Sequence, residues 1–318
     1  MILLSHPTAN QNVRQTALAF ASAGLLEEFW TCVRWQQGGL LDRAAAIAPR
    51  VQNELRRRSF AKEVEPFIRT HSTREWGRLM SSQLAGGALT RDEIDPLSVD
   101  SVYLALDRRV AKRLTAGLTI KAVYAYDAGA LATFRAAKER GIRCIYEHPI
   151  VHWRLVREIQ REEATLNPEW APTLGALADS DEKLARKDEE LALADLVITA
   201  STFSKESLTK APTLRAPVRI VPYGADPVAA RQPRSHRDGK LRVLFVGALS
   251  QAKGLGYLLE ATARLEGKIE LTLIGRRVYP GIPAPAVLGK YRWIPSLPHD
   301  ELLQEMSRHD VLVLPSLH

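Results

Sequence analysis

The stretch LRVLFVGALSQAKGLGYLLE, residues 241–260, decides the fold. Its first six residues form an apolar run that predicts a buried strand ending before Gly247. A short loop carrying Lys253 and Gly254 follows, and apolar residues at helical spacing begin immediately afterwards. A strand, a glycine-containing loop and a helix in this order predict one repeat of a parallel α/β sheet.

The same alternation of short apolar runs and helix-period segments extends over most of the chain. We therefore expect an α/β fold with doubly wound parallel sheets. The expected strands are Ile2–Ser5, Phe29–Val33, Ala122–Tyr126, Ile142–Tyr146, Leu196–Ala200, Val218–Val221, Leu241–Val246, Glu270–Ile274, Tyr291–Ile294 and Val311–Leu314. A helix is expected at Asp127–Arg140, with Asp127 capping its start and Gly141 its end.

The length of 318 residues suggests two domains. We expect an N-terminal domain over 1–226, a Pro- and Arg-rich linker at 227–239 and a second domain at 240–318. Residues 40–115 interrupt the alternation and predict a mostly helical insert with no clear strand. The second domain would hold only about half the residues of a typical one, and its last apolar strand has no following helices. It is therefore expected to be incomplete.

Composition narrows the class of protein. Apolar residues make up 46% and charged residues 25%, which excludes a disordered chain. The two cysteines, Cys32 and Cys144, sit in expected strands and indicate a reduced, cytoplasmic setting. No apolar run is long enough to span a membrane. The net charge of +8 favours an anionic partner, but not nucleic acid, because basic residues alternate with acidic ones and lack an aromatic platform.

The segment from Arg50 to Arg78 contains eight basic and four acidic residues, so it carries half of the net positive charge of the chain. One interpretation is a solvated helix face. The other is a docking surface for anionic lipid headgroups, with Phe60, Phe67 and Trp76 as its apolar side. The second interpretation predicts peripheral contact with the inner face of a membrane.

Lys253 is a candidate phosphate ligand. The N-terminus of the helix after Gly254 carries a partial positive charge, and Lys253 beside it adds a full one. An ordinary strand–helix loop with a surface lysine explains the same residues when the loop is taken alone.

The loop does not stand alone. Residues 241–260 resemble the donor-domain signature of family 4 glycosyltransferases, in which Val-Gly-x-Leu-Ser-x-x-Lys-Gly precedes a helix. Four further segments match the family in order: Ala194–Lys205, Val218–Asp226, Leu271–Gly275 and Asp310–Ser316. The resemblance implies the GT-B fold, two Rossmann-like domains with a cleft between them.

The resemblance also implies a reaction. A sugar would move from a nucleotide diphosphate donor to a hydroxyl of a carbohydrate or lipid-linked acceptor, with its anomeric configuration retained and without a metal or other cofactor. In the matching positions, Gly247, Lys253 and Gly254 would hold the departing diphosphate. Gly275 and Arg276 would lie beside the nucleotide.

Three residues of the first domain match family positions near the sugar and the donor phosphates. His148 follows an expected strand and is the best match to a family histidine close to the transferred sugar; a purely structural histidine is the alternative. Asn10 and Asn12 stand where the family has a glycine-rich loop. Asparagine tolerates left-handed backbone angles, but it also caps helices, and the sequence leaves both roles open.

Two departures keep other functions open. Ala248 stands where the family often has arginine, and the Glu-Gly-Phe-Gly signature that follows Pro-Ser in the family is missing after Ser316. An inactive, truncated glycosyltransferase is therefore one alternative. A GT-B-fold epimerase or phosphorylase is another, and it would need no acceptor.

Two candidate metal sites are rejected. Asp179-Ser-Asp181 resembles a metal-binding Asp-x-Asp motif, but it precedes a charged helical stretch and is better explained as a helix cap. His148 and His152 are separated by Pro149 and have no evident third ligand.

Overall fold

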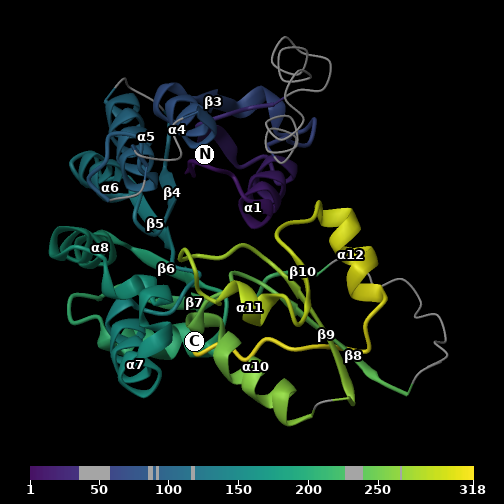
Figure 1. The fold of residues 1–318 in the computed structure, drawn as a ribbon. Helices are drawn as coiled ribbons and strands as arrows, with labels where there is room; N and C mark the ends of the chain where they lie inside the picture. The colour runs from purple at the N-terminus through teal and green to yellow at the C-terminus, as the bar shows by residue number, and fades with distance from the viewer. Residues whose placement is uncertain (36–57, 85–88, 91–92, 116–118, 226–238, 266) are drawn as a thin grey trace. The chain divides into compact units, whose positions relative to one another are not determined.

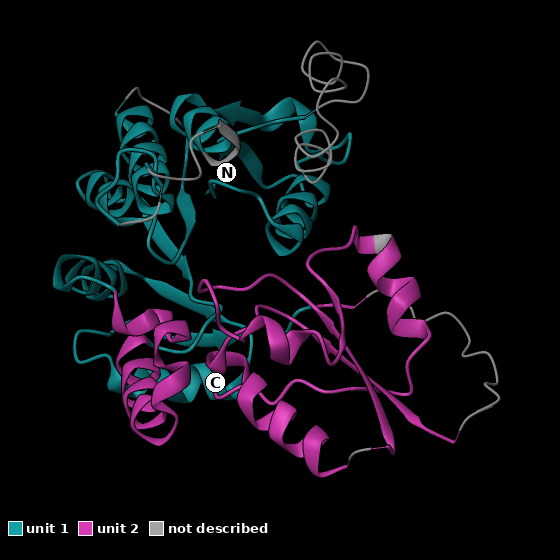
Figure 2. Ribbon diagram, viewed as in Figure 1, with its two compact units in different colours: residues 1–152, 179–223 teal, residues 153–178, 224–318 magenta. Residues whose placement is uncertain are grey.

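The computed structural model describes all residues except 36–57, 85–88, 91–92, 116–118, 226–238 and 266 (Figure 1). The chain forms two compact units: unit 1 comprises residues 1–152 and 179–223, and unit 2 comprises 153–178 and 224–318 (Figure 2). Residues 153–178, expected in the first domain, thus belong to the second unit. The expected linker lies almost wholly outside the described residues.

Unit 1 is built on a seven-stranded sheet in the order β3-β2-β1-β4-β5-β6-β7. Its strands are β1 (Ile2–Ser5), β2 (Leu26–Thr31), β3 (Ile68–Thr70), β4 (Ala122–Tyr126), β5 (Arg143–Glu147), β6 (Leu196–Thr199) and β7 (Val218–Ile220). All neighbouring strands are parallel. The order reverses between β1 and β4, as in a doubly wound sheet.

Strand β3 corrects one expectation, because it lies inside the segment for which no strand was expected. Only Ile68 of its three residues is buried, while Arg69 and Thr70 are exposed. A three-residue edge strand with one buried apolar side chain leaves no periodic signal in the sequence. The expected strands at β1 and β4 have the observed bounds.

Helices connect the strands of unit 1. They are α1 (Gln11–Ser22), α4 (Thr73–Leu84), α5 (Val99–Leu114), α6 (Leu131–Lys138), α8 (Asp181–Leu193) and α9 (Thr202–Ser207), with 3-10 turns η1 (Glu65–Phe67) and η4 (Leu208–Lys210). Asn10, Ser98, Ser180 and Ser201 cap four of these helices, each accepting the backbone N–H three residues ahead.

Two separate cores cover the two faces of this sheet. In β4, Val123 and Ala125 belong to the cluster formed with α5, α6 and α8. Tyr124 and Tyr126 point to the opposite face and belong to the cluster formed with α1. Because side chains alternate along a strand, β4 is buried on both faces.

Unit 2 has a four-stranded parallel sheet in the order β10-β9-β8-β11. Its strands are β8 (Leu241–Val246), β9 (Ile269–Ile274), β10 (Arg292–Ile294) and β11 (Val311–Leu312). Its helices are α7 (Trp153–Leu166), α10 (Leu255–Arg264), α11 (Pro285–Leu288) and α12 (His299–Ser307), with 3-10 turns η2 (Pro168–Thr173), η3 (Gly175–Leu177) and η5 (Gln251–Lys253). The expected α/β class with parallel sheets is confirmed.

The core of unit 2 explains why residues 153–178 belong to it. Phe245 and Leu273 of the strands pack with Leu255 of α10, and Trp170 of η2 packs against the same cluster. Leu312 in the last strand is, in contrast, 43% exposed. None of the helices within the described residues has the length and hydropathy that crossing a membrane requires.

Candidate functional site

In unit 1, β1 and β4 are neighbours, but the strands that follow them lie in opposite directions across the sheet: β2 beyond β1, and β5 beyond β4. Ligands of doubly wound sheets bind beyond the carboxyl ends of the strands at such a reversal. Asn10 and Asn12 follow β1, and His148 follows β5, the next strand beyond β4. The residues predicted in this unit therefore lie along one edge of the sheet.

The loop between β1 and α1 is organised by His6. Its Nδ1 accepts the backbone N–H groups of Thr8 at 3.2 Å and Ala9 at 2.9 Å. Burial lowers the pKa of His6 to about 4, so the ring is neutral at pH 7. Ala9 has a φ of +46°, a left-handed conformation that favours glycine.

The two asparagines of this loop have different surroundings. Asn10 has a φ of −59°, and its side-chain oxygen accepts the N–H of Val13 at 3.1 Å. Asn10 is therefore the helix cap, and the left-handed position belongs to Ala9 instead. The half-buried Asn12 hydrogen-bonds the hydroxyl of Tyr223. A contact of either asparagine with a donor stays a prediction.

His148 lies directly after β5 and is 2% exposed. Its ring Nδ1 is 3.2 Å from Oδ1 of Asp127. Its Nε2 is buried and has no hydrogen-bond partner among the described residues. The ring therefore has one nitrogen fixed by the protein and the other available.

Asp127 corrects the expected helix cap. Helix α6 begins at Leu131 rather than at Asp127, and its cap position is Ala130, which offers no side-chain oxygen. Asp127 instead accepts hydrogen bonds from His148 and from the hydroxyl of Tyr146, 2.9 Å away. Its other oxygen is 3.1 Å from Nζ of Lys187.

The charge of Asp127 is stabilised by these partners. Burial alone would raise the pKa of its carboxyl, but Lys187, His148 and Tyr146 together hold that pKa well below its usual range. Asp127 is therefore a carboxylate at neutral pH, and it accepts the proton on His148 Nδ1.

Two buried carboxyl groups from other helices cap α6. Asp107 of α5 accepts the N–H groups of Ala132 at 2.7 Å and Thr133 at 2.8 Å. Glu190 of α8 accepts those of Ala128, Ala130 and Leu131 at 2.9–3.2 Å. These long-range contacts satisfy the helix start, which leaves Asp127 free to bind His148.

A second carboxylate at this edge is surrounded by tyrosines. Glu147, the last residue of β5, accepts the hydroxyl of Tyr124 at 2.7 Å and that of Tyr223 at 3.4 Å. Burial and the nearby Glu147 raise the pKa of Tyr223 to about 12, so its hydroxyl stays protonated and remains a donor. Tyr223 is 46% exposed and presents this cluster at the surface of unit 1.

Four residues around His148 were not predicted from the sequence: Asp127, Tyr146, Lys187 and Glu190. One signal pointed to Asp127, which follows a buried strand at the edge where ligands bind. Lys187 and Glu190 lie in a charged helix whose sequence does not distinguish them from surface residues.

In unit 2, two glycines end neighbouring strands. Gly247 follows β8 and Gly275 follows β9. A Cβ on Gly275 would lie 1.7 Å from the carbonyl oxygen of Gly247, so no other residue fits without moving the backbone. The close approach of the two chain segments thus depends on glycine.

Lys253 ends the turn η5, and Gly254 starts α10 with a left-handed φ of +66°. A Cβ on Gly254 would lie 1.9 Å from the carbonyl oxygen of Pro315. Lys253 is half-buried, and the described residues include no ion-pair partner for its ammonium group. A lysine at a helix N-terminus, positioned by glycine, is the arrangement that the sequence predicted.

Side chains of residues 153–178 hold this turn in place. Gln251 accepts the N–H of Gly256 at 2.9 Å through Oε1 and donates from Nε2 to Glu163 of α7 at 2.7 Å. Its backbone N–H donates to Oγ1 of Thr173 at 2.9 Å. The N–H of Gly256 in the first turn of α10 is therefore satisfied within the protein, and the half-buried Lys253 supplies a full positive charge beside this helix start.

Arg276 and Arg277 follow Gly275. Both are exposed, and the guanidinium of Arg277 lies 5.3 Å from the ring centroid of Trp293. The Trp293 indole donates to the carbonyl oxygen of Gly275 at 2.9 Å. The contact of Arg276 with a nucleotide stays a prediction.

The rejected metal candidates have structural roles. Ser180 caps α8, and Asp179 pairs with Lys183 at 2.7 Å. His152 Nε2 lies 3.6 Å from Asp188. Within the described part of the chain, no three metal-ligating side chains gather.

The expected lipid-docking aromatics are partly buried. Phe60 packs on Phe29 with ring centroids 5.5 Å apart, and Phe67 and Trp76 pack against the cores of unit 1. Arg58 and Arg78 both pair with the buried Glu75, at 2.6 and 2.7 Å. Residues 50–57 of this basic stretch lie outside the described part of the chain.

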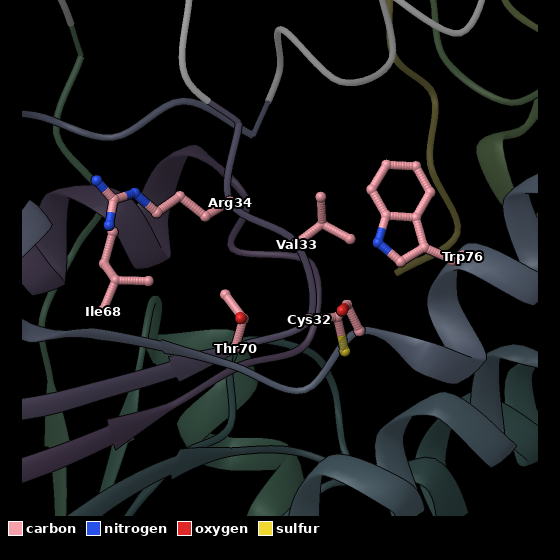
Figure 3. A pocket seen from close by; sticks show the side chains of 7 residues that line it. Cys32, Val33, Arg34, Ile68, Thr70 and Trp76 are labelled. Carbon is pink, nitrogen blue, oxygen red and sulfur yellow. The ribbon is translucent and has the colours of Figure 1, made fainter. Parts of the chain in front are cut away.

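A cavity of about 290 Å³ lies beyond β2 and β3 in unit 1 (Figure 3). It is lined by Cys32, Val33, Arg34, Ile68, Thr70, Ser72 and Trp76. Burial raises the pKa of the Cys32 thiol to about 12, which keeps it protonated and unreactive.

Comparison with known proteins identifies the fold. No family model matches the chain, and no curated protein matches it. Among solved structures, sucrose-phosphate synthase from Thermosynechococcus elongatus superposes with a TM-score of 0.63 at 17% identity, covering 100% of this chain and 75% of that one.

Two further structures agree. HepE from Anabaena, solved with UDP and glucose, gives a TM-score of 0.52 at 14% identity, covering 98% of this chain and 73% of that one. The lipopolysaccharide outer core galactosyltransferase WaaB gives 0.51 at 14% identity, covering 99% and 73%. The chain has the fold of these proteins, the GT-B fold.

Proposed function

We propose that this chain is a retaining glycosyltransferase that moves a sugar from a nucleotide diphosphate donor to a hydroxyl acceptor without a metal ion. The turn from Gly247 to Gly254 carries this proposal. It places Lys253, which has no ion-pair partner among the described residues, at the start of α10. A cation at a helix N-terminus favours a diphosphate as ligand.

The leaving group gains negative charge as the reaction proceeds. The bond between sugar C1 and the diphosphate breaks, the bond from C1 to the acceptor oxygen forms, and the acceptor proton leaves with the diphosphate. Lys253 and the α10 dipole stabilise the growing charge, which lowers the barrier. Arg276 is exposed beside Gly275 and serves the nucleotide side.

His148 is the sugar-binding residue of unit 1. Its Nδ1 is bound to Asp127, and its Nε2 is buried without a partner in the described chain. A buried nitrogen without a hydrogen bond costs free energy that a ligand hydroxyl would recover. A sugar hydroxyl has the donor and acceptor capacity to fill this position.

The acceptor is a carbohydrate or a lipid-linked carbohydrate. A peripheral contact with an anionic membrane rests on the basic stretch of residues 50–78 alone, because Phe60 and Trp76 are engaged in the cores. Co-sedimentation with vesicles containing anionic lipid, compared with neutral vesicles, tests it; equal recovery in both would contradict it.

The test of the diphosphate site is a kinetic comparison of lysine variants. With nucleotide-sugars as donors, Lys253→Ala should lower kcat/KM by about 10- to 10³-fold, as loss of one charge-stabilising donor does. Lys253→Arg should keep part of the activity. Lys268→Ala is the matched control, because it removes an exposed lysine directly before β9, outside the turn that holds Lys253. A Lys253→Ala rate within about twofold of wild type would remove the role of Lys253.

A further inference from the structure

We infer that Glu190, Tyr146 and Asp127 form a buried hydrogen-bonded chain that positions His148, with Glu190 as its protonated end. The inference rests on the proposed function in one respect, that His148 binds the sugar. All four side chains belong to unit 1, and each is at most 12% exposed.

The number of protons in the chain leads to this conclusion. The Tyr146 hydroxyl oxygen lies 2.9 Å from Oδ1 of Asp127 and 2.8 Å from Oε2 of Glu190. A hydroxyl carries one proton and can donate to only one of the two. The other short contact needs a proton supplied by a carboxyl group.

Glu190 is the carboxyl group that supplies it. Asp127 is bound to Lys187 and His148 and is therefore ionised. The buried ammonium group of Lys187 is thus balanced by the carboxylate of Asp127, and a second negative charge on Glu190 would lack such a partner among the described residues. Glu190 then donates from Oε2 to Tyr146, and Tyr146 donates to Asp127.

The surroundings of Glu190 support this assignment. Burial, then the neighbouring Asp127 and Asp107, raise the pKa of Glu190 to about 8, against the lowering effects of Ala130 N–H and Tyr146. The titratable His152 ring lies 6.2 Å from that of His148, and the charged groups around the hydrogen-bonded chain include Lys187 on Asp127 and Arg186, which acts on Asp107. Lys187 and Arg186 lie on α8 with Glu190.

The chain fixes the His148 ring in two ways. Asp127 accepts the Nδ1 proton, which directs the remaining nitrogen, Nε2, to the ligand side. Tyr146 stacks on the ring with centroids 6.0 Å apart and planes 13° apart. Tyr146 therefore both supports the ring and donates to Asp127, which anchors it, and Glu190 is a positioning residue three hydrogen bonds away from the ring.

Histidine nitrogen signals test the chain without any substrate. In the full-length protein labelled with 15N-histidine, the His148 ring signals, assigned with His148→Asn, are followed from about pH 6 to about pH 10. The wild type should show a step near pH 8, where Glu190 loses its proton. Glu190→Gln should lack the step, and Glu189→Gln, on the exposed neighbouring residue of α8, should keep it.

Glutamine keeps Oε1 as the acceptor for Ala130 and Leu131 but loses the bond from Ala128, so folding is verified by thermal unfolding. If this variant does not fold, Tyr146→Phe replaces it and should reduce the step. A step of unchanged size in either variant, or no step in the wild type, would overturn the inference.

A kinetic measurement adds a second result. Tyr146→Phe should lower kcat about 10-fold with little change in donor KM, as the loss of an orienting partner does. An unchanged kcat would contradict the positioning role. If the pH 8 step is found but neither the wild type nor any variant transfers sugar, the inferred hydrogen-bonded chain is supported and the proposed function fails.

Discussion

The candidate sites of the two units are built in different ways. In unit 1, His148 is held by side chains that are distant in sequence: Asp127 is 21 residues away, and Glu190 reaches Tyr146 over 44 residues. In unit 2, the backbone beside Lys253 depends on close approaches that only glycine permits, at 254 and 275, and contacts of Gln251 with Glu163 and Thr173 support the turn. The site of unit 1 is therefore expected to respond to pH, because it is built from titratable side chains. The site of unit 2 is expected to respond to a Cβ added at Gly254 or Gly275.

The largest effect is expected for Gly275→Ala. The new Cβ would meet the Gly247 carbonyl oxygen at 1.7 Å, so the ends of β8 and β9 must separate. We expect unfolding free energy to fall by about 3 kcal/mol or more and diphosphate binding to be lost. Gly175→Ala, where nothing lies within 4 Å of the added Cβ, is the control, measured by urea unfolding. Equal stability of the two variants would contradict the close approach.

The next effect concerns the pH dependence of stability through Glu190. Its folded-state pKa of about 8 exceeds the ordinary 4.5, so between these values the folded chain holds a proton that the unfolded chain releases. Wild-type stability should therefore fall as pH rises from 4.5 to 8, by up to about 1.4 kcal/mol per pH unit. Glu190→Gln should flatten this slope, as followed by urea unfolding at several pH values. The same slope in the variant would show that Glu190 is ionised in the fold.

A smaller effect is expected for His148→Ala. It removes the nitrogen that the proposed function assigns to the sugar but leaves Asp127 bound to Lys187 and Tyr146. We expect kcat to fall about 100-fold, because the sugar would lose its orienting contact, and the unfolding temperature to fall as well, because loss of the buried ring leaves a cavity beside Tyr146. Unchanged transfer by a folded variant would assign His148 a structural role only.

The smallest effect is expected for the His6 loop. The pKa of His6 is about 4 in the fold and 6.5 ordinarily, so the unfolded chain takes up a proton first as pH falls. Wild-type stability should decrease from pH 6.5 to pH 4, by at most about 1.4 kcal/mol per pH unit. His6→Asn keeps an acceptor near Nδ1 but does not titrate, so this decrease should disappear. A decrease that persists would point to another group.

The same contrast explains how much the sequence could predict. Apolar runs such as Leu241–Val246 become buried strands, and glycine beside lysine is visible as a local pattern, so the fold class and the turn at Lys253 were predictable. The chain from Glu190 to His148 was not, because it forms only when α8 packs beside β5. Asp127 was assigned to a helix cap because the capping carboxylates, Asp107 and Glu190, come from distant helices.

The assignment of residues 153–178 to unit 2 could not be predicted from the sequence either. Their contribution to unit 2 rests on Trp170 packing and on the Glu163–Gln251 hydrogen bond, 88 residues apart in sequence. Neither Trp170 nor Glu163 belongs to a sequence motif. Such contacts are decided by tertiary packing, which local periodicity does not encode.

The most direct test of the proposed function is the structure of the reaction product. The protein is incubated with nucleotide-sugars, with and without a hydroxyl acceptor, and the anomeric proton of the product is identified by NMR. We predict a glycoside that forms only with acceptor, retains the donor's anomeric configuration, and appears far more slowly with Lys253→Ala or His148→Ala. An inverted glycoside, or an epimerised or phosphorolysed sugar that forms without acceptor, would contradict the account.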